Sequence, residues 1–444
     1  MVKLPPSGRI RTIVLFALPI IGGMASQNVL NLVDTAMVGM LGADALAAVG
    51  MASFANFMAV AFITGLSAGV QAMAARRVGE GRLNESAVPL NGGLMLAAAI
   101  AVPLSSVLIL TADRYFPWLV GDPDVVELGV PYLQARLVAM VAIGMNFSFR
   151  GYWNGISMSR IYLQTLVIMH VCNIGLNYLL IFGKLGFPEL GSTGAGIGTA
   201  ISTYLGTAIY VTMAFRHARS SGFFGGLPQR ETVRTMLTLA VPAGLQQFFF
   251  ATGMTAFFWI IGQVGTAELA ASNVLVQLLL VVLLPGLGFG LAAASLVGQA
   301  LGRKDTADAA AWGWHVSFVA SVLVGALSLV GLVFPRLILT LFLHDEALLE
   351  LAVVPMRLLG ATMAIDTVGT VLMNALLGAG DSKRVMTISV SLQWGLFLPA
   401  AFLLGPVLGF GINGVWLAQV IYRLLQTVAF VNLWRRGRWA TIEV

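Results

Sequence analysis

The chain has 444 residues, of which 58% are hydrophobic and only 10% are charged, and its formal net charge is +6. Soluble domains carry about 25% charged residues, so this composition excludes a soluble protein and predicts an all-α polytopic membrane protein. The basic excess does not indicate a nucleic-acid partner, because Lys and Arg punctuate the apolar runs and form no single patch. Cys172 is the only cysteine, which excludes an intramolecular disulfide.

Twelve apolar segments follow one another, and each is long enough for the roughly 20 residues that cross a bilayer. The first follows a short basic N-terminus and is too long for a cleaved signal peptide, so we expect it to be retained. The predicted transmembrane helices cover residues 13–40, 45–75, 87–112, 128–149, 161–183, 193–215, 234–262, 269–300, 311–342, 349–377, 384–405 and 411–434.

Basic residues are distributed unevenly between the breaks. With the N-terminus in the cytoplasm, the inner breaks hold nineteen Lys and Arg residues, whereas the outer breaks hold only Arg114, Lys184 and Arg336. Basic residues are enriched in cytoplasmic loops. The pattern predicts a multi-pass protein of the plasma membrane (the inner membrane in a Gram-negative cell) with both termini in the cytoplasm.

The two halves of the chain resemble each other. Ala17-Leu-Pro19 recurs as Ala240-Val-Pro242, and the segment LGADALAA from Leu41 recurs as VGTAELAA from Val264, both at an offset of 223 residues. Each repeat holds six spans, so both enter the membrane the same way round, as in transporters built from parallel repeats. We predict two six-helix lobes related by a pseudo-twofold along the membrane normal, with boundaries at 1–219 (N-lobe), 220–233 (cytoplasmic linker) and 234–444 (C-lobe).

The first span carries a polar stripe that ends in an acid. Gln27, Asn31 and Asp34 are spaced i, i+4 and i+7 and therefore share one helix face. A carboxylate inside a membrane helix costs roughly 2.5–3.5 kcal/mol on insertion scales, so it normally faces a cavity or a partner. Asp34 is predicted to bind a coupling ion, to act as a substrate counter-ion, or to join two helices. Gln27 and Asn31 are candidates to line a substrate cavity.

Possible co-ligands lie further along the same repeat. Asn173 and Asn177 are spaced i, i+4 in the fifth span, and Thr199 lies in a Gly- and Ala-rich stretch that opens the sixth. Together with Asp34 they would supply oxygen ligands for H⁺ or Na⁺. Ordinary interhelical hydrogen bonding is the alternative reading of the same residues.

The second repeat has its own acid at a non-equivalent position. Asp366 lies in the tenth span, and its counterpart in the first repeat is near Asn146, a further candidate to line the cavity; the counterpart of Asp34 is near Phe257. We predict that Asp366 also carries the coupling ion. Its pairing with Arg357 is the competing interpretation.

Other features complete the sequence-based picture. Pro19 and Pro242 lie inside predicted spans, where proline removes a backbone hydrogen bond and permits either a hinge or a static kink. His170 and His315 are too isolated to suggest a metal site. Walker A, nucleophile-elbow and HExxH motifs are absent from the sequence, so it supports neither ATP hydrolysis nor another enzymatic activity.

Several motifs together resemble the multidrug and toxic compound extrusion (MATE) family over essentially the full chain. They are Val33-Asp34-Thr35-Ala-Met-Val-Gly39, Asn173-Ile-Gly-Leu-Asn177-Tyr-Leu-Leu-Ile-Phe-Gly183, Gly186-Phe-Pro-Glu-Leu-Gly191, Gly194-Ala-Gly196 and Asn374-Ala-Leu-Leu-Gly-Ala-Gly-Asp-Ser-Lys383. The resemblance implies two six-helix lobes and a secondary antiporter. Such a protein would export cationic and aromatic compounds in exchange for H⁺ or Na⁺, without ATP or another cofactor. We expect a monomer, because one chain holds both lobes.

The same resemblance matches Asp34, Asn173, Asn177 and Thr199 to an N-lobe cation site. It matches Asp366 to the C-lobe acid of the NorM-like branch. That branch commonly places a Glu where this chain reads Phe248-Phe-Phe250, and the DinF-like branch has a second acid where this chain has Asn177. The branch therefore stays open. The alternative function is a flippase for lipid-linked precursors or a polysaccharide exporter of the related superfamily; basic residues confined to loops disfavour such anionic cargo.

Overall fold

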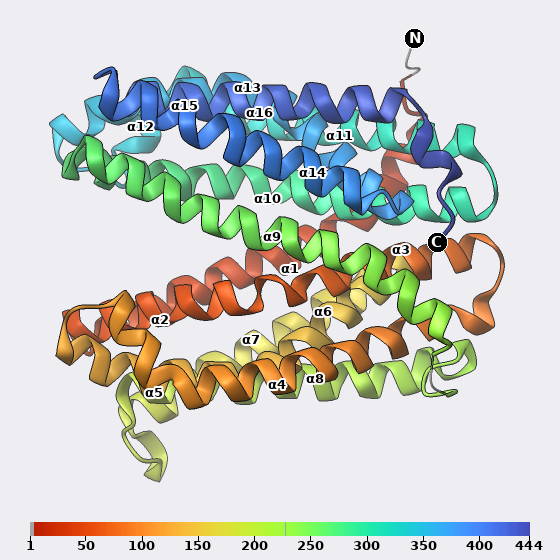
Figure 1. Cartoon of the computed structure of the whole chain (residues 1–444), viewed down its shortest axis with the longest axis horizontal. Coiled ribbons are helices and arrows are strands. Elements are labelled where there is room, and N and C mark those ends of the chain that lie inside the picture. Colours follow the sequence, from red (N-terminus) through yellow and green to blue (C-terminus); the bar gives the residue numbers. More distant parts are fainter. Residues whose placement is uncertain (1–3, 227) are drawn as a thin grey trace. The chain divides into compact units, whose positions relative to one another are not determined.

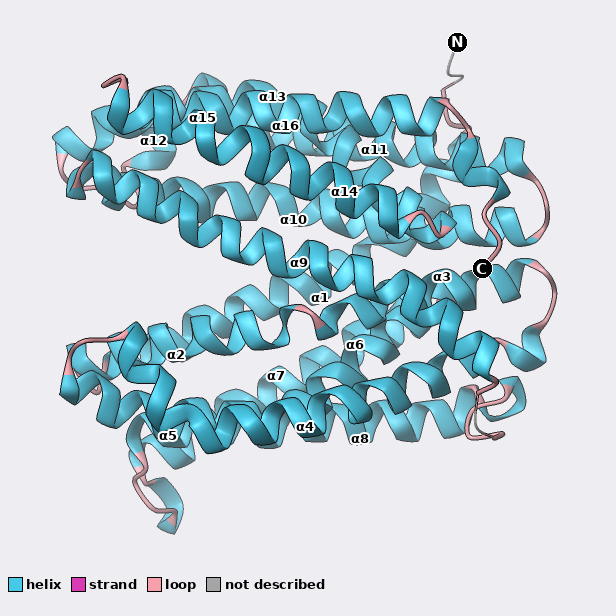
Figure 2. Ribbon diagram, in the orientation of Figure 1, coloured by secondary structure: helices cyan, strands magenta, loops and turns pink. Residues whose placement is uncertain are grey.

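The computed structural model describes residues 4–226 and 228–444, which are almost entirely helical and contain no strand (Figure 2). Eleven helices among these residues are long and apolar enough to cross a membrane. A twelfth span results if α5 (Pro123–Val138) and α6 (Met140–Gly155), which meet at an angle of 46°, count as one. The all-α polytopic fold predicted from composition is confirmed.

The helices follow the order of the predicted spans (Figure 1). The predicted span 45–75 consists of two helices joined by a 3₁₀ turn, and the span 384–405 is interrupted by π-helical turns. Besides α5 and α6, the helices are α1 (Ser7–Gly39), α2 (Ala43–Ala61), α3 (Leu66–Gly79), α4 (Val88–Leu119), α7 (Ser159–Phe182), α8 (Gly191–His217), α9 (Arg230–Val264), α10 (Thr266–Gly302), α11 (Thr306–Val333), α12 (Pro335–Leu339), α13 (Glu346–Ala379), α14 (Ser382–Leu392), α15 (Leu398–Phe402) and α16 (Gly411–Arg435).

The internal repeat is visible in where the helices begin. Four pairs of helices, α1 and α9, α2 and α10, α5 and α13, and α7 and α14, start 223 residues apart, which is the offset of the sequence repeat. These matching helix starts extend the similarity between the two halves from short sequence motifs to the positions of helices along the chain. Positions in the two halves can therefore be compared residue by residue.

The chain forms two compact units. We call Gly22–Gly244 unit 2, and the chain up to Ile21 together with Leu245–Val444 unit 1. The boundaries fall just after Pro19 in α1 and Pro242 in α9, at repeat-equivalent positions, so each of these helices contributes to both units. The division predicted at the linker 220–233, and the hinge role of the two prolines, stay predictions.

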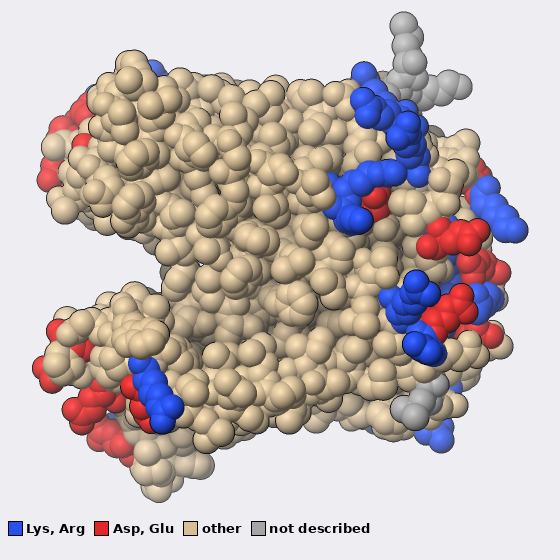
Figure 3. All heavy atoms as spheres, viewed as in Figure 1, with Lys and Arg blue, Asp and Glu red and all other residues tan. Residues whose placement is uncertain are grey.

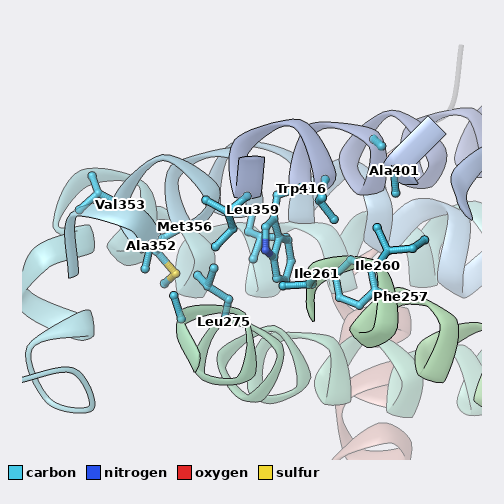
Figure 4. Packing of buried hydrophobic residues seen from close by; sticks show 14 of the residues in the cluster. Phe257, Ile260, Ile261, Leu275, Ala352, Val353, Met356, Leu359, Ala401 and Trp416 are labelled. Carbon is cyan, nitrogen blue, oxygen red and sulfur yellow. The ribbon is translucent and has the colours of Figure 1, made fainter. Parts of the chain in front are cut away.

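An aromatic core fills unit 1 at the position that corresponds to Asp34. Phe257 on α9 is the repeat counterpart of Asp34 and is 2% exposed. Its ring lies 5.6 Å from those of Phe397 and Trp416, measured between ring centroids. Figure 4 shows Phe257 and Trp416 within this core. The indole of Trp416 donates to Ser272 Oγ at 3.1 Å, which satisfies its only polar atom. Where unit 2 has a carboxylate, unit 1 has a packed apolar interior.

The start of α1 is fixed to α11 within unit 1. The Arg9 guanidinium forms an ion pair with Asp308 and lies 4.5 Å above the Trp312 ring. Asp308 also accepts a hydrogen bond from Trp312 Nε1 at 3.0 Å, and it forms an ion pair with Arg303 at 2.9 Å.

Figure 3 shows Lys and Arg gathered near helix ends, with a largely uncharged stretch along the middle of the helices in this view.

In unit 2, α6 approaches α3 so closely that only glycine fits between them. A Cβ atom built on Gly151 would lie 2.3 Å from the backbone oxygen of Ser67, and one on Gly155 would lie 2.9 Å from that of Gln71. Small residues at helix contacts are typical of membrane proteins, where close packing rather than water exclusion holds helices together. This contact positions α6, which in turn packs against α8.

Replacing Gly151 by Ala is therefore expected to destabilise the protein. The clash is with backbone, so the helices must separate, and overpacking of this kind typically costs about 1–3 kcal/mol. Thermal unfolding of the purified protein in detergent measures the effect as a lower midpoint. Gly175→Ala in α7 is the matched control, because no atom lies within 4 Å of the new methyl group. Equal midpoints for the two variants would show that the α3–α6 contact is less tight than described.

Candidate functional site

The polar stripe of α1 lies against α7, and two glycines allow the helices to approach. A Cβ atom on Gly23 would lie 2.6 Å from the ring of Tyr162, and one on Gly22 would lie 3.4 Å from Leu163. About three turns further along α1, this packing brings Asp34 to the asparagines of α7. The close approach therefore turns two separate sequence stripes into one polar contact inside unit 2.

Asp34 is surrounded by amide and hydroxyl groups. Asn177 Nδ2 donates to Asp34 Oδ1 at 2.9 Å. With its nitrogen turned toward the acid, the Asn173 amide also donates to Asp34 Oδ1 at 3.2 Å. Its oxygen then accepts from Ser202 Oγ at 3.0 Å and from Thr199 Oγ1 at 3.1 Å, both on α8. The structure thus brings together all four predicted cation-site residues, which come from three helices.

The site contains an oxygen atom without a donor. Among the described residues, Asn177 Oδ1 is buried and has no hydrogen-bond partner. It sits against Gly198, where a Cβ atom would come within 2.2 Å of it, so even alanine would displace the amide. A buried acceptor without a donor costs free energy unless something occupies it. Asn177 thus donates to Asp34 through its nitrogen while its oxygen has no donor.

No fixed basic partner neutralises Asp34. In the residues that the structure describes, no Lys or Arg forms an ion pair with its carboxylate, and Arg136 on α5 attracts it only over a longer range. The carboxylate is half-buried, whereas Asn173 and Asn177 are fully buried. A half-buried acid that has hydrogen-bond donors but no permanent counter-ion can bind an exchangeable proton or cation.

Asp366 has a different environment. Its carboxylate is buried in unit 1 and forms an ion pair of 2.7 Å with Arg423 on α16, which also donates to Thr370 Oγ1 at 3.2 Å. The competing interpretation named the wrong partner, because Arg357 is exposed on the surface of α13. The coupling role of Asp366 stays a prediction. The ion pair argues against it, because the positive charge is already supplied by the chain.

The remaining candidates take part in helix-to-helix contacts. Gln27 Nε2 donates to Asn31 Oδ1 at 3.1 Å, which keeps both on the polar face of α1. Asn146 joins α6 to α8: its Nδ2 donates to the backbone oxygen of Thr203 at 3.1 Å, and its Oδ1 accepts from Thr207 at 2.8 Å. The cavity-lining role predicted for Gln27, Asn31 and Asn146 stays a prediction.

Sequence reasoning missed residues that the same spacing rule would have found. His170 precedes Asn173 by three positions and Asn177 by seven, so it lies on the same face of α7. Ser202 follows Thr199 by three positions on α8. Arg423 gave no such signal, because its pairing with Asp366 depends on how α16 packs against α13.

A separate cavity lies elsewhere in unit 2. It has a volume of about 450 Å³ and is lined mainly by apolar side chains of α4, α6 and the linker, among them Leu94, Met145 and Phe224. None of the residues predicted from the sequence lines it. The polar site and this cavity are thus distinct features of the unit.

The family model that matches this chain matches both halves of the internal repeat. The family model MatE matches residues 19–179 and 242–403, two segments that begin 223 residues apart. The chain is 24% identical to the probable multidrug resistance protein NorM of Thermotoga maritima, over 97% of the chain and 93% of that protein. It is 26% identical to the multidrug resistance protein NorM of Photobacterium profundum, over 97% and 95%.

Solved structures have the same fold. An outward-facing multidrug resistance MATE family transporter of the MOP superfamily superposes with a TM-score of 0.88 at 19% identity, covering 99% of this chain and all of that one. A MOP superfamily transporter from Pyrococcus furiosus, for which a reverse polarity of the binding pocket suggests a different function, reaches 0.86 at 19% identity, covering 99% and 100%. The fold alone therefore does not identify what this chain transports.

Proposed function

This chain belongs to the MatE family, and from that premise we propose that it is a secondary antiporter which exports small organic cations or aromatic compounds in exchange for H⁺ or Na⁺. The relatives that match nearly its whole length carry the name multidrug resistance protein. The exchange would use the ion gradient across the plasma membrane as its energy source.

The observation that carries this proposal is the state of Asp34. Its carboxylate lies within a membrane helix, accepts hydrogen bonds from Asn177 and Asn173, and has no basic partner within ion-pair distance among the described residues. An uncompensated acid at such a depth is expensive, so an arriving cation or proton is bound strongly enough to matter. The unsatisfied Asn177 Oδ1 gives that ion, or the proton on the acid, a second contact.

Binding of a proton or Na⁺ at Asp34 would affect α1, because that helix carries the acid. A bound proton or Na⁺ removes the net charge of the site and changes which way the amides of α7 point. A ligand shifts a conformational equilibrium only by its different affinity for the two states. We propose that the loaded and empty states of this site differ in how α1 packs against α7, and that this difference governs access for the substrate.

Only one site is proposed for the coupling ion. The corresponding position in unit 1 is filled by Phe257 within an aromatic core, and Asp366 has Arg423 as a built-in counter-ion. A stoichiometry of one proton or one Na⁺ per turnover fits this asymmetry.

The test is efflux of a fluorescent organic cation from proteoliposomes in which a pH gradient, a Na⁺ gradient or neither is imposed. We expect one of the two gradients to drive transport and to identify the coupling ion. Equal rates in all three conditions would contradict antiport. Stimulation by neither gradient, together with movement of a fluorescent lipid-linked phosphate across the bilayer, would favour the flippase alternative.

A further inference from the structure

A histidine lies on the same contact as Asp34, about two helical turns away. His170 on α7 is 5% exposed, and both of its ring nitrogens meet side chains of α1. Nδ1 lies 3.0 Å from Ser26 Oγ, and Nε2 lies 3.1 Å from Gln27 Oε1. The imidazole is therefore held at both ends by the polar stripe that leads to the acid.

The partners on α1 fix what each nitrogen does. Gln27 Nε2 donates to Asn31 Oδ1 at 3.1 Å, and in this arrangement Gln27 Oε1 accepts a hydrogen from Nε2 of the histidine. Ser26 Oγ is 2.9 Å from the backbone oxygen of Gly23 as well as 3.0 Å from Nδ1. A hydroxyl has one hydrogen and can donate to only one of these two acceptors at a time.

This geometry accommodates two protonation states. When the hydroxyl of Ser26 donates to Nδ1, the ring is a neutral imidazole with its hydrogen on Nε2. When the hydroxyl turns to the Gly23 oxygen, Ser26 Oγ accepts a hydrogen from Nδ1, and the ring is an imidazolium that donates at both ends. No heavy atom has to move between the two states. A histidine with only a packing role needs one of these arrangements and not both.

Of the three side chains joined here, Ser26, Gln27 and His170, only the imidazole can titrate. Its hydrogen bonds go to α1 alone. The charged and titratable groups on its own helix are Arg160, Tyr162, Cys172 and Tyr178. Those on the elements packed against this part of it are Asp34 on α1, Arg150 on α6, and Tyr204 and Tyr210 on α8. Arg150 is engaged elsewhere, because its Nε donates to Ser67 Oγ at 3.2 Å. Asn31 at the end of the chain of hydrogen bonds is exposed, so the stripe is not sealed off by the protein.

The second repeat holds a natural comparison. The counterpart of His170 is Gln393, which is buried and whose Nε2 donates to the backbone oxygen of Phe250 at 3.4 Å. Phe250 is the counterpart of Gln27. In unit 1 this helix contact is made by the amide of Gln393, which cannot titrate. In unit 2, beside the unpaired Asp34, the same contact is made by the imidazole of His170, which can.

We propose that His170 is a second proton-binding group of unit 2: it takes up a proton from solvent at Nδ1 while the Ser26 hydroxyl turns, and returns it by the reverse step. The positive charge lies about 10 Å along α1 from Asp34. It favours the ionised acid and disfavours a cation bound there. The link to transport rests on the proposed antiport function, whereas proton binding at His170 does not.

The proposal is tested by nitrogen NMR of ¹⁵N-histidine-labelled protein in nanodiscs between about pH 3 and pH 8, a range that extends well below the one in which imidazole ordinarily titrates. The chain has four histidines. The signals that disappear in His170→Gln belong to His170. If that variant does not fold, single Gln variants of His217, His315 and His344 identify the other three sets of signals, and the remaining set belongs to His170. We expect a neutral ring with hydrogen on Nε2 at the upper pH and a doubly protonated ring at the lower pH. A single unchanged tautomer throughout would overturn the proposal.

Transport supplies the second readout. We expect His170→Gln to retain efflux but to lose the dependence of its rate on pH that the wild type shows in this range. His217→Gln is the control, because His217 is exposed at the end of α8 and lies outside the contact between α1 and α7. An unchanged pH profile in His170→Gln would overturn the link to transport. Wild-type protein that transports nothing under any gradient, while His170 still titrates, would instead refute the proposed antiport.

Discussion

Replacing Asp34 by Asn is expected to reduce ion-driven efflux to the level of empty vesicles while the protein remains folded. The amide oxygen of the new side chain can still accept from Asn177, so the contact between α1 and α7 survives. The charge that binds the ion does not, and no other acid of unit 2 lies among the amides of α7 and α8. Efflux of a fluorescent organic cation from proteoliposomes, with and without the ion gradient, measures the loss.

The matched control is Asp44→Asn. Asp44 is an exposed acid in the first turn of α2, so this variant makes the same chemical change outside the site. It is expected to transport at the wild-type rate. Thermal unfolding should place both variants close to the wild type. Gradient-driven efflux by Asp34→Asn at more than a small fraction of the wild-type rate would show that the coupling ion binds elsewhere.

Replacing Arg423 by Met is expected to destabilise the protein more than any loss of a surface charge. The variant leaves the carboxylate of Asp366 buried without its counter-ion, and removing one partner of a buried ion pair costs about 3–5 kcal/mol. The guanidinium side chain is 23% exposed, which places the expected cost near the lower end, about 3 kcal/mol. The unfolding midpoint of the purified protein in detergent measures it. The double variant Asp366→Asn with Arg423→Met should recover much of the loss.

Arg357→Met is the control, because Arg357 is exposed on the same helix as Asp366 and lacks the buried partner. Its midpoint is expected to match the wild type. If Arg423→Met were equally stable, the ion pair would not be structural, and Asp366 would be free to act as the second coupling acid predicted from the sequence. In that case Asp366→Asn would lose efflux without losing stability.

Local patterns in the sequence account for much of the candidate site. The spacing of Gln27, Asn31 and Asp34 and that of Asn173 and Asn177 each specify one face of a helix, and the structure joins the two faces. Helix geometry alone fixes which residues share a face, so this part was predictable. The same rule also pointed to His170, which was set aside because it was considered as a metal ligand rather than as a member of the stripe.

Contacts between distant helices were not predictable in the same way. Asp366 and Arg423 are 57 residues apart on α13 and α16, and only the packing of those two helices brings them together. The boundary between the units likewise falls inside α1 and α9, where the apolar sequence runs on without a break. Hydropathy locates spans along a chain, but it carries no information about which faces of two spans touch.

The most direct test of the account is whether the movement of substrate and the movement of the ion share one acid. Proteoliposomes loaded with an organic cation and a pH-sensitive or Na⁺-sensitive dye are diluted into buffer without the cation, and ion entry is followed as the substrate leaves. The account predicts that the outward substrate gradient drives one of the two ions inward in the wild type and in Asp44→Asn, and neither ion in Asp34→Asn. Ion entry in Asp34→Asn at the wild-type rate would contradict it.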